Sequence, residues 1–315
     1  MVKLWVLAAT AFACVRIGVG ATTEPGRGGG DGAAAVAAPG AALEKREGTF
    51  SFTEGPACDS KGNVFFTDQP NDVIYKFDAA GKLSVFLKPC GRSNGLCFDA
   101  HDNLIACADE MNQLWSIAPD GSHRVLVKDF WGKLLNGPND VWLMPELAPG
   151  AGQAMYITDP LYKRDYWKRG GMEQPGEYVY WVSADGKTVK PVARDLKRPN
   201  GIIGTPDGKT LYVSDIGDKK TYSYSIQPDG TLAERKLFCT MGSDGMTIDS
   251  EGNVYLTGKG VTIFSAGGEQ IGHIDVPEKW TGNICFGGAD RDVLFITAST
   301  GIYTMRMRVH GVGSQ

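Results

Sequence analysis

Residues 59–68 read DSKGNVFFTD, a glycine turn followed by a run of β-branched and aromatic residues that is typical of a short strand. Comparable stretches return five more times along the chain. They end at residues 109, 159, 215, 258 and 298, so the period is about 40 to 56 residues. An alternating strand follows each stretch, as in residues 74–81 (IYKFDAAG).

This period, with no helical pattern between the strands, predicts an all-β fold, a six-bladed β-propeller. Each repeat would supply one blade, and loops from all six blades would meet at the mouth of an axial channel. Forty-two glycines in 315 residues fit a chain that turns tightly between nearly every pair of strands. The sequence therefore predicts one large domain with a site on its axis.

The overall charge and the motifs exclude several classes of function. A net charge of −4 and a pI near 5.6 argue against nucleic acid as a partner, because phosphate backbones attract basic surfaces. No internal apolar stretch has the length of a membrane span. The sequence contains no GxSxG or HExxH motif, and its four histidines recur at no equivalent position, which disfavours a histidine-based hydrolase.

The N-terminus differs from the repeats. Lys3 precedes the apolar residues 4–12 and small residues follow, so residues 1–21 are interpreted as a signal peptide for export to the periplasm or the medium. Cys14 follows small residues as in a lipoprotein signal, which leaves lipid anchoring as the alternative. Residues 22–48, rich in Gly, Ala and Pro, are predicted to be a flexible linker.

The catalytic propeller is therefore predicted over residues 49–310, with a strand near residues 49–52 closing the last blade. Six cysteines lie within this range, and export would permit a disulfide. Cys97, Cys107 and Cys285, however, lie in apolar strand runs that are typical of a core. No CxxC pair is present, which disfavours a zinc thiolate site, and no particular disulfide is predicted.

A polar residue recurs just before the first apolar strand of each blade, usually ahead of a glycine. Equivalent positions in successive blades face the same axial mouth, so we expect these side chains to form a ring of oxygen donors. The six residues are Glu54, Asn94, Asn139, Asn200, Asp244 and Asn283.

Each ring position has a simpler interpretation when taken alone. Asn-Gly and Asp-Gly are common turn dipeptides whose side chains bond the local backbone. This interpretation does not account for Glu54, because Glu is a weak turn former. Two carboxylates, Glu54 and Asp244, with amide oxygens such as that of Asn200, make a hard-oxygen site suited to Ca²⁺, Mg²⁺ or Mn²⁺.

Several motifs resemble those of the senescence marker protein, gluconolactonase and luciferin-regenerating enzyme family of six-bladed propellers. The resemblance covers residues 49–308 and depends on the order and spacing of the motifs. They read EGP at residues 54–56, LNGPNDV at 135–141, TDPLY at 158–162, RPNG at 198–201, PDGKTLY at 206–212, SDGM at 243–246, DSEG at 249–252 and TGNICFGG at 281–288.

The resemblance implies one divalent metal ion in the axial mouth, held by Glu54, Asn200 and Asp244. Ca²⁺ is the first expectation, with Mg²⁺, Mn²⁺ or Zn²⁺ as alternatives. Family members are mostly lactonases, so the implied activity is hydrolysis of a small cyclic ester, most simply a sugar-acid lactone. Asp244 would serve as general base for a water acidified by the ion.

The resemblance also implies substrate contacts from Asn139, with Asp140 beside it, and Asn94 of the ring is assigned the same role. Some family members carry an Arg two residues before the substrate Asn, whereas this chain has Gly137. The long loop 162–177, with two tyrosines, a tryptophan and four cations, is either a lid over the mouth or a solvated surface loop.

Two further functions stay open from the sequence. An exported, non-catalytic propeller would use the mouth to bind a carbohydrate or a protein partner. An esterase or phosphotriesterase would use the same site on another ester. The acids at two ring positions favour an enzyme, since a pure repeat scaffold would carry Asn at every position.

Overall fold

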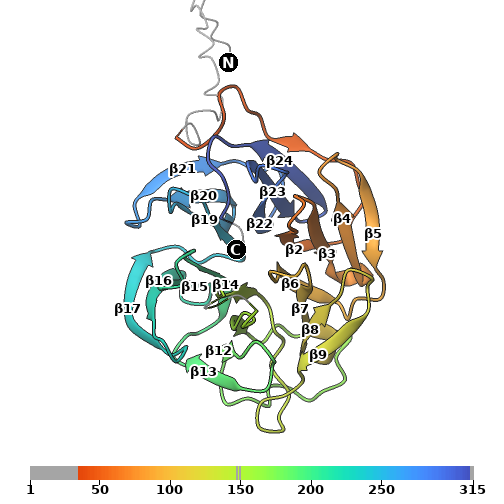
Figure 1. Ribbon diagram of the computed structural model, residues 1–315, viewed down its shortest axis with the longest axis vertical. Helices are drawn as coiled ribbons and strands as arrows, with labels where there is room; N and C mark the ends of the chain where they lie inside the picture. The colour runs from red at the N-terminus through yellow and green to blue at the C-terminus, as the bar shows by residue number, and fades with distance from the viewer. Residues whose placement is uncertain (1–34, 147, 149, 313–315) are drawn as a thin grey trace, which may run out of the picture.

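The computed structural model describes residues 35–146, 148 and 150–312. Within them, six four-stranded antiparallel sheets surround a central axis, which confirms the predicted six-bladed β-propeller (Figure 1). In five blades the strands follow one another along the chain from the axis outwards. The innermost strand of each blade therefore begins where the sequence places the recurring polar residue.

The six blades contain the following strands. Blade one consists of β2 (Thr53–Cys58), β3 (Val64–Asp68), β4 (Val73–Phe77) and β5 (Leu83–Leu87), and blade two of β6 (Ser93–Phe98), β7 (Leu104–Ala108), β8 (Gln113–Ile117) and β9 (His123–Val127). Blade three consists of β10 (Val141–Leu143), β11 (Met155–Asp159), β12 (Tyr178–Val182) and β13 (Val189–Ala193), and blade four of β14 (Pro199–Gly204), β15 (Thr210–Asp215), β16 (Lys220–Ile226) and β17 (Leu232–Cys239). Blade five consists of β18 (Met246–Ile248), β19 (Val254–Gly258), β20 (Gly260–Phe264) and β21 (Gln270–Ile274), and blade six of β22 (Thr281–Gly287), β23 (Val293–Ala298), β24 (Gly301–Arg306) and the N-terminal β1 (Glu44–Lys45).

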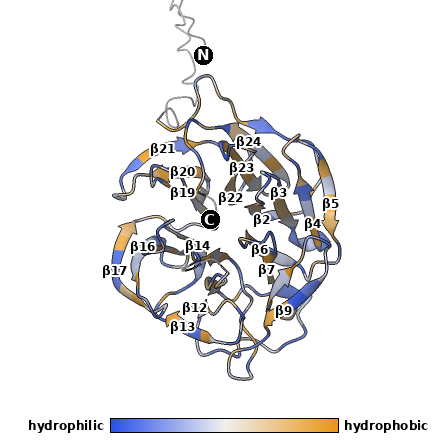
Figure 2. Ribbon diagram, in the orientation of Figure 1, coloured by the Kyte–Doolittle hydropathy of each residue, from blue (hydrophilic) through white to orange (hydrophobic). Residues whose placement is uncertain are grey.

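The two-part repeat of the sequence corresponds to the second and third strands of each blade. In blade one, β3 and β4 pair with Val64 opposite Phe77 and Phe66 opposite Tyr75. The second strands are buried on both faces, which is why they read as continuous apolar runs. The outermost strands β17 and β21 carry both hydrophilic and hydrophobic residues because one face meets solvent (Figure 2).

The N-terminal segment corrects the predicted domain boundary. Residues 36–46 are part of the propeller rather than a flexible linker: Val36 is 1% exposed within the core of the last blades. In β1, Glu44 pairs with Thr304 and Lys45 with Tyr303 of β24. Without this strand β24 would expose an unpaired edge, so β1 takes the closing place that was predicted for residues 49–52.

The predicted signal peptide, residues 1–21, and Cys14 lie outside the described residues. In the part of the chain that is described, no helix has the length and apolar character needed to cross a bilayer. The six cysteines of the described ranges are all free, and Cys90, Cys107 and Cys239 are buried.

Candidate active site

The six ring residues converge at one end of the propeller axis, as predicted. Four of them lie near the start of innermost strands, on β2, β6, β14 and β22, and the other two lie two residues before the first residue of β10 and β18. Five of the six are at most 6% exposed, and Asp244 is partly buried. These neighbouring inner strands contact one another around the axis, which brings positions far apart in sequence into one site.

Three glycines that follow ring residues, and Gly282 before Asn283, are explained by close packing rather than by turns. Gly95, Gly201 and Gly245 do not adopt positive φ angles, so the turn interpretation is wrong at these positions. A Cβ atom at Gly245 would lie 2.0 Å from Cγ of Asn283. A Cβ atom at Gly282 would lie 2.7 Å from Oε1 of Glu54. Only glycine lets adjacent ring residues approach this closely at the narrow axis.

Buried threonines on the second strands hold the backbone of the ring. Thr158 Oγ1 accepts a hydrogen bond from the Asp140 N–H at 3.1 Å, and Thr297 Oγ1 accepts one from the Asn283 N–H at 3.1 Å. The hydroxyls therefore replace ladder hydrogen bonds where the inner strands bulge at the ring, which keeps these buried backbone groups satisfied.

A hydrogen bond joins two ring residues, Asn200 and Asp244. Asn200 Nδ2 donates to Asp244 Oδ1 at 2.8 Å and to Tyr162 Oη at 2.8 Å. With both amide hydrogens used, the Asn200 oxygen is turned to the other side, where it is buried and has no hydrogen-bond partner among the described residues. A buried amide oxygen without a donor is an unsatisfied acceptor.

The carboxylates of the site are held under mutual repulsion. Burial raises the pKa of Glu54 well above its usual range, and the charges of Asp244 and Asp140 raise it further. Burial raises the pKa of Asp244 to about 6, although hydrogen bonds from Trp280 and Asn200 oppose this shift. Burial also raises the pKa of Asp140 to about 7. A positive charge placed among these groups would stabilise their ionised forms.

These residues fit a divalent cation. Glu54, Asp244 and the partnerless oxygen of Asn200 are hard-oxygen donors, and in the described chain neither carboxylate forms an ion pair with Lys, Arg or His. No group of three or more His, Cys, Asp and Glu side chains in the described ranges could hold a metal ion. A cation at the mouth would therefore need amide oxygens as well as the two acids.

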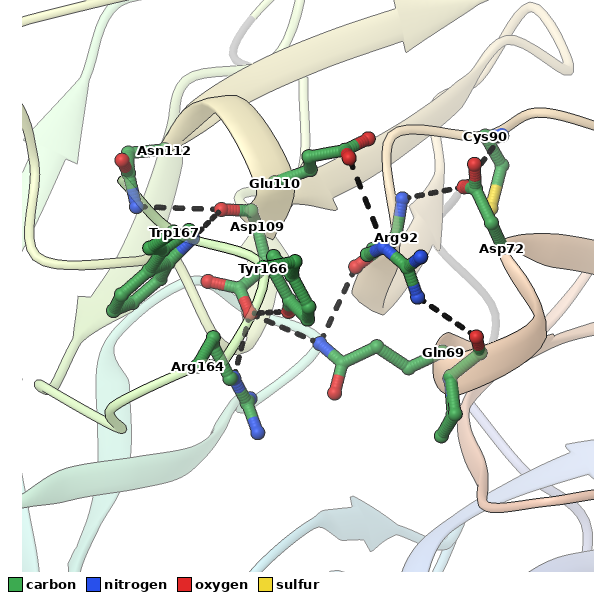
Figure 3. A network of polar contacts seen from close by, with 11 residues as sticks. Gln69, Asp72, Cys90, Arg92, Asp109, Glu110, Asn112, Arg164, Tyr166 and Trp167 are labelled. Carbon is green, nitrogen blue, oxygen red and sulfur yellow. Dashed lines mark hydrogen bonds and ion pairs between the residues drawn. The ribbon is translucent and has the colours of Figure 1, made fainter. Parts of the chain in front are cut away.

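The loop 162–177, which we call the mouth loop, is bound to the propeller by Asp109 (Figure 3). Asp109 Oδ2 accepts hydrogen bonds from Tyr166 Oη at 2.5 Å and from Arg164 Nε at 2.8 Å. Trp167 Nε1 donates to the Asp109 carbonyl oxygen at 2.9 Å. These contacts, together with that of Tyr162 to Asn200, favour the lid interpretation over that of a solvated surface loop.

Asp109 can bind the mouth loop because, unlike the equivalent Asp residues of blades one and three, it does not hold the segment that enters an inner strand among the residues described. At the equivalent place in blade one, Asp68 accepts the backbone N–H groups of the segment entering the inner strand, and Asp159 does the same in blade three. In blade two this segment is held instead by Asp72, which accepts the N–H groups of Cys90 and Arg92.

The sequence prediction missed three site residues. Tyr162 contacts Asn200, Trp280 Nε1 donates to Asp244 Oδ2 at 2.6 Å, and the charge of Arg164 lowers the pKa of Asp244. Tyr162 closes the TDPLY motif and Trp280 directly precedes the TGN motif, so adjacency to a motif was the available signal. Asn94 and Asn139 lie at the same level of the ring: the Gly95 N–H donates to the Asn139 carbonyl oxygen at 2.7 Å.

Comparisons with known proteins agree with this geometry. Residues 52–300 match the family model described as the SMP-30/Gluconolactonase/LRE-like region. A gluconolactonase from Zymomonas mobilis is 28% identical over 291 residues, which cover 82% of this chain and 80% of that protein. The solved structure of a gluconolactonase from Xanthomonas campestris superimposes with a TM-score of 0.78 at 27% identity, covering 87% of this chain and 92% of the other. Regucalcin from Agrobacterium tumefaciens, a calcium-binding protein, superimposes with a TM-score of 0.70 at 20% identity over 86% of this chain and 96% of that one, which supports the fold alone.

Fold and site define a class, that of six-bladed propellers with an oxygen-lined site in the axial mouth. Within this class, the chain belongs to the SMP-30/gluconolactonase/LRE-like family, because the family model matches most of its length.

Proposed function

We propose that this protein hydrolyses a small cyclic ester, most simply a sugar-acid lactone, with a divalent cation at Glu54, Asn200 and Asp244. The observation that carries the proposal is the fixed orientation of Asn200. Its buried oxygen has no hydrogen-bond partner among the described residues, while its amide hydrogens bind Tyr162 and Asp244. The relatives named gluconolactonase support the choice of substrate class. Ca²⁺ is the first metal to test, because carboxylate and amide oxygens are its usual protein ligands.

A cation bound there would polarise the lactone carbonyl and acidify a water molecule. Asp244 removes a proton from the attacking water and delivers it to the ring oxygen as the carbonyl–oxygen bond breaks, which yields a hydroxy acid. Asp244 is well oriented for this transfer, because Asn200 and Trp280 each hold one of its carboxylate oxygens. Asn94, Asn139 and Asp140 then contact the substrate.

The mouth loop sets the substrate preference. A Cβ atom at Gly137 would lie 2.6 Å from Asp109 Oδ1 and 3.0 Å from the ring of Trp167, so the loop fills the space that a side chain at this position would need. We assign the recognition of substrate oxygens to Arg164, whose guanidinium pairs with Asp109 and whose charge reaches Asp244. Arg164 replaces the Arg that some relatives carry at the position of Gly137.

Hydrolysis of glucono-1,5-lactone tests the proposal. Proton release is followed after removal of divalent ions and again with Ca²⁺, Mg²⁺, Mn²⁺ or Zn²⁺ added. Turnover restored by a metal and absent in Asp244→Ala, but present in the surface control Asp275→Ala, supports the assignment. Metal-independent turnover, or full activity in Asp244→Ala, contradicts it. A rise in melting temperature with metal but no turnover retains the site and rejects this lactone.

The proposal includes export through residues 1–21, with lipid anchoring through Cys14 as the alternative. Cell fractionation, combined with the mass of the mature protein, distinguishes the two. A cytoplasmic protein that retains residues 1–21 would contradict both.

A further inference from the structure

A cavity of about 370 Å³ lies on the propeller axis, on the far side of the ring from the mouth. Its walls are inner-strand residues that follow the ring positions, such as residues 56–58 after Glu54 and 284–286 after Asn283. Asp140 and Asn283 form its roof, whereas the proposed metal ligands Glu54, Asn200 and Asp244 are not among the described residues that line it. This cavity therefore excludes the proposed metal ligands and borders the candidate active site only at its roof, where Asp140 lies.

The walls of the cavity are mostly apolar, with side chains such as Leu96, Val141, Ile202 and Phe286. Among the described lining residues, the only charged side chains are Asp140 in the roof and Arg291. Arg291 lies in the turn between β22 and β23. The end of β22 lies four residues after Asn283, which places this turn about 13 Å below the roof.

Arg291 is the one cation among the described residues that line the cavity. Within the described chain it forms no ion pair, and its one recorded side-chain hydrogen bond goes from Nη2 to the Asp59 carbonyl oxygen at 3.0 Å. Its side chain is part of the cavity wall, together with those of Cys58, Cys97 and Cys285. A half-buried guanidinium beside apolar walls favours a carboxylate ligand.

Three thiols provide a marker for the occupancy of the cavity. Cys58, Cys97 and Cys285 lie on the innermost strands β2, β6 and β22, are free, and are partly exposed on the cavity wall. They do not form a metal site, since no suitable cluster of His, Cys, Asp and Glu exists in the described residues. They contribute soft, weakly polar surface that suits an apolar ligand.

We propose that the axial cavity is a second ligand site, which binds a small monocarboxylate with a compact apolar body. The carboxylate would lie on Arg291 and the apolar body against the inner strands. The volume is near the lower end of the range of about 300 to 1,000 Å³ for small-molecule pockets. A sugar acid does not suit this site, because its many hydroxyls would lack partners on apolar walls. The inference does not depend on the proposed lactonase activity.

Alkylation of the cavity thiols tests the proposal. The full chain is treated with iodoacetamide, with and without about 10 mM benzoate, which would saturate a site with a Kd near 1 mM. Peptide mass spectrometry then gives the rate at each cysteine. We expect benzoate to slow alkylation of Cys58, Cys97 and Cys285 by about tenfold, while neutral benzamide has little effect. The buried Cys90 and Cys239, which lie outside the cavity, are internal controls.

Matched variants identify the anchoring charge. Arg291→Gln is expected to lose the protection by benzoate, and Arg291→Lys to retain part of it. In Asp244→Asn the protection should persist, because the mouth is not involved. Equal protection by benzamide, unchanged protection in a folded Arg291→Gln, or loss of protection in Asp244→Asn would overturn the proposal. Absence of protection in the parent protein would overturn it as well.

Discussion

The indole of Trp280 and the carboxylate of Asp244 form a 2.6 Å hydrogen bond between blade six and blade five. Trp280 is 36% exposed, yet its indole N–H donates to an acid at the mouth rather than to solvent. Asn200 holds the other oxygen of the same carboxylate. Asp244 is therefore fixed from both neighbouring blades, which is the arrangement expected of a group that must keep one orientation.

Trp280→Phe should raise the pKa of Asp244. The indole hydrogen bond favours the ionised carboxylate, so its loss moves the pKa upward from about 6, by roughly one unit. Metal affinity falls at low pH because Asp244 becomes protonated, and this fall (the acid limb) should then shift to higher pH by the same amount. Titration calorimetry between pH 5 and about pH 8 measures the shift. Trp131→Phe, at a side chain that is 86% exposed, is the matched control. An unchanged acid limb in Trp280→Phe would show that the hydrogen bond has no such role.

Asn200→Ala should weaken metal binding at least tenfold, a loss of about 1.4 kcal/mol or more. The substitution removes the partnerless oxygen and also frees Asp244 Oδ1 from its donor. The propeller should stay folded, because Asn200 packs at the mouth and not between the sheets. Metal-induced stabilisation in thermal melts is the measurement, and the exposed Asn71→Ala is the control. Equal stabilisation of Asn200→Ala and the parent would exclude Asn200 as a ligand.

The metal-free protein should lose stability as the pH rises from about 4 to about 7. Burial raises the pKa of Asp140 and of Asp159 to about 7, so the folded state holds protons that the unfolded chain has already released. Stability from these protons is present at low pH and disappears as the pH passes the folded pKa values. Each group contributes a few kcal/mol at most.

Urea unfolding of the metal-free protein across this pH range measures how the free energy of unfolding changes with pH, that is, its slope. Asp140→Asn should flatten it, because this residue then no longer titrates. The same slope in the variant and the parent would show that Asp140 is not protonated in the folded protein at low pH.

The fold was predictable because each blade repeats the same local chemistry. Second strands are buried between neighbours, so they carry continuous apolar runs that a single sequence reveals. The innermost strands were not recognised as separate strands, since glycines required by axial packing interrupt their apolar pattern. The closing strand β1 was missed because Glu44 and Lys45 pair through their backbones and carry no apolar signal.

The site was predictable only in part. Ring positions follow from the repeat, because equivalent residues of every blade must face the axis. Tyr162 and Trp280 lie outside the ring and reach it from a loop and from a strand entry, so no periodicity marks them. The role of Asp109 was not predicted although this residue does occupy a repeated position. It ends a repeat as Asp68 and Asp159 do, yet it binds a distant loop instead of its own blade.

Asp109→Asn should release the mouth loop while the blades stay intact. Arg164 and Tyr166 both donate to the Asp109 carboxylate, and charge-assisted hydrogen bonds of this kind contribute about 1.5 to 3 kcal/mol each. Loss of the charge should therefore raise the rate of tryptic cleavage at the four cations of the mouth loop by about tenfold or more. If the loop acts as a lid, KM for the lactone should rise more than kcat falls.

Asp120→Asn is the matched control, because this acid lies in an exposed hairpin turn of the same blade and bonds only its own turn. Cleavage of the mouth loop in the control should equal that of the parent. If Asp109→Asn resists trypsin as well as the parent does, the loop is held by its other contacts, such as that of Arg169 to the Leu135 carbonyl oxygen. A faster cleavage with unchanged KM would instead separate the anchoring of the loop from substrate binding, and Arg164 would lose its assigned role.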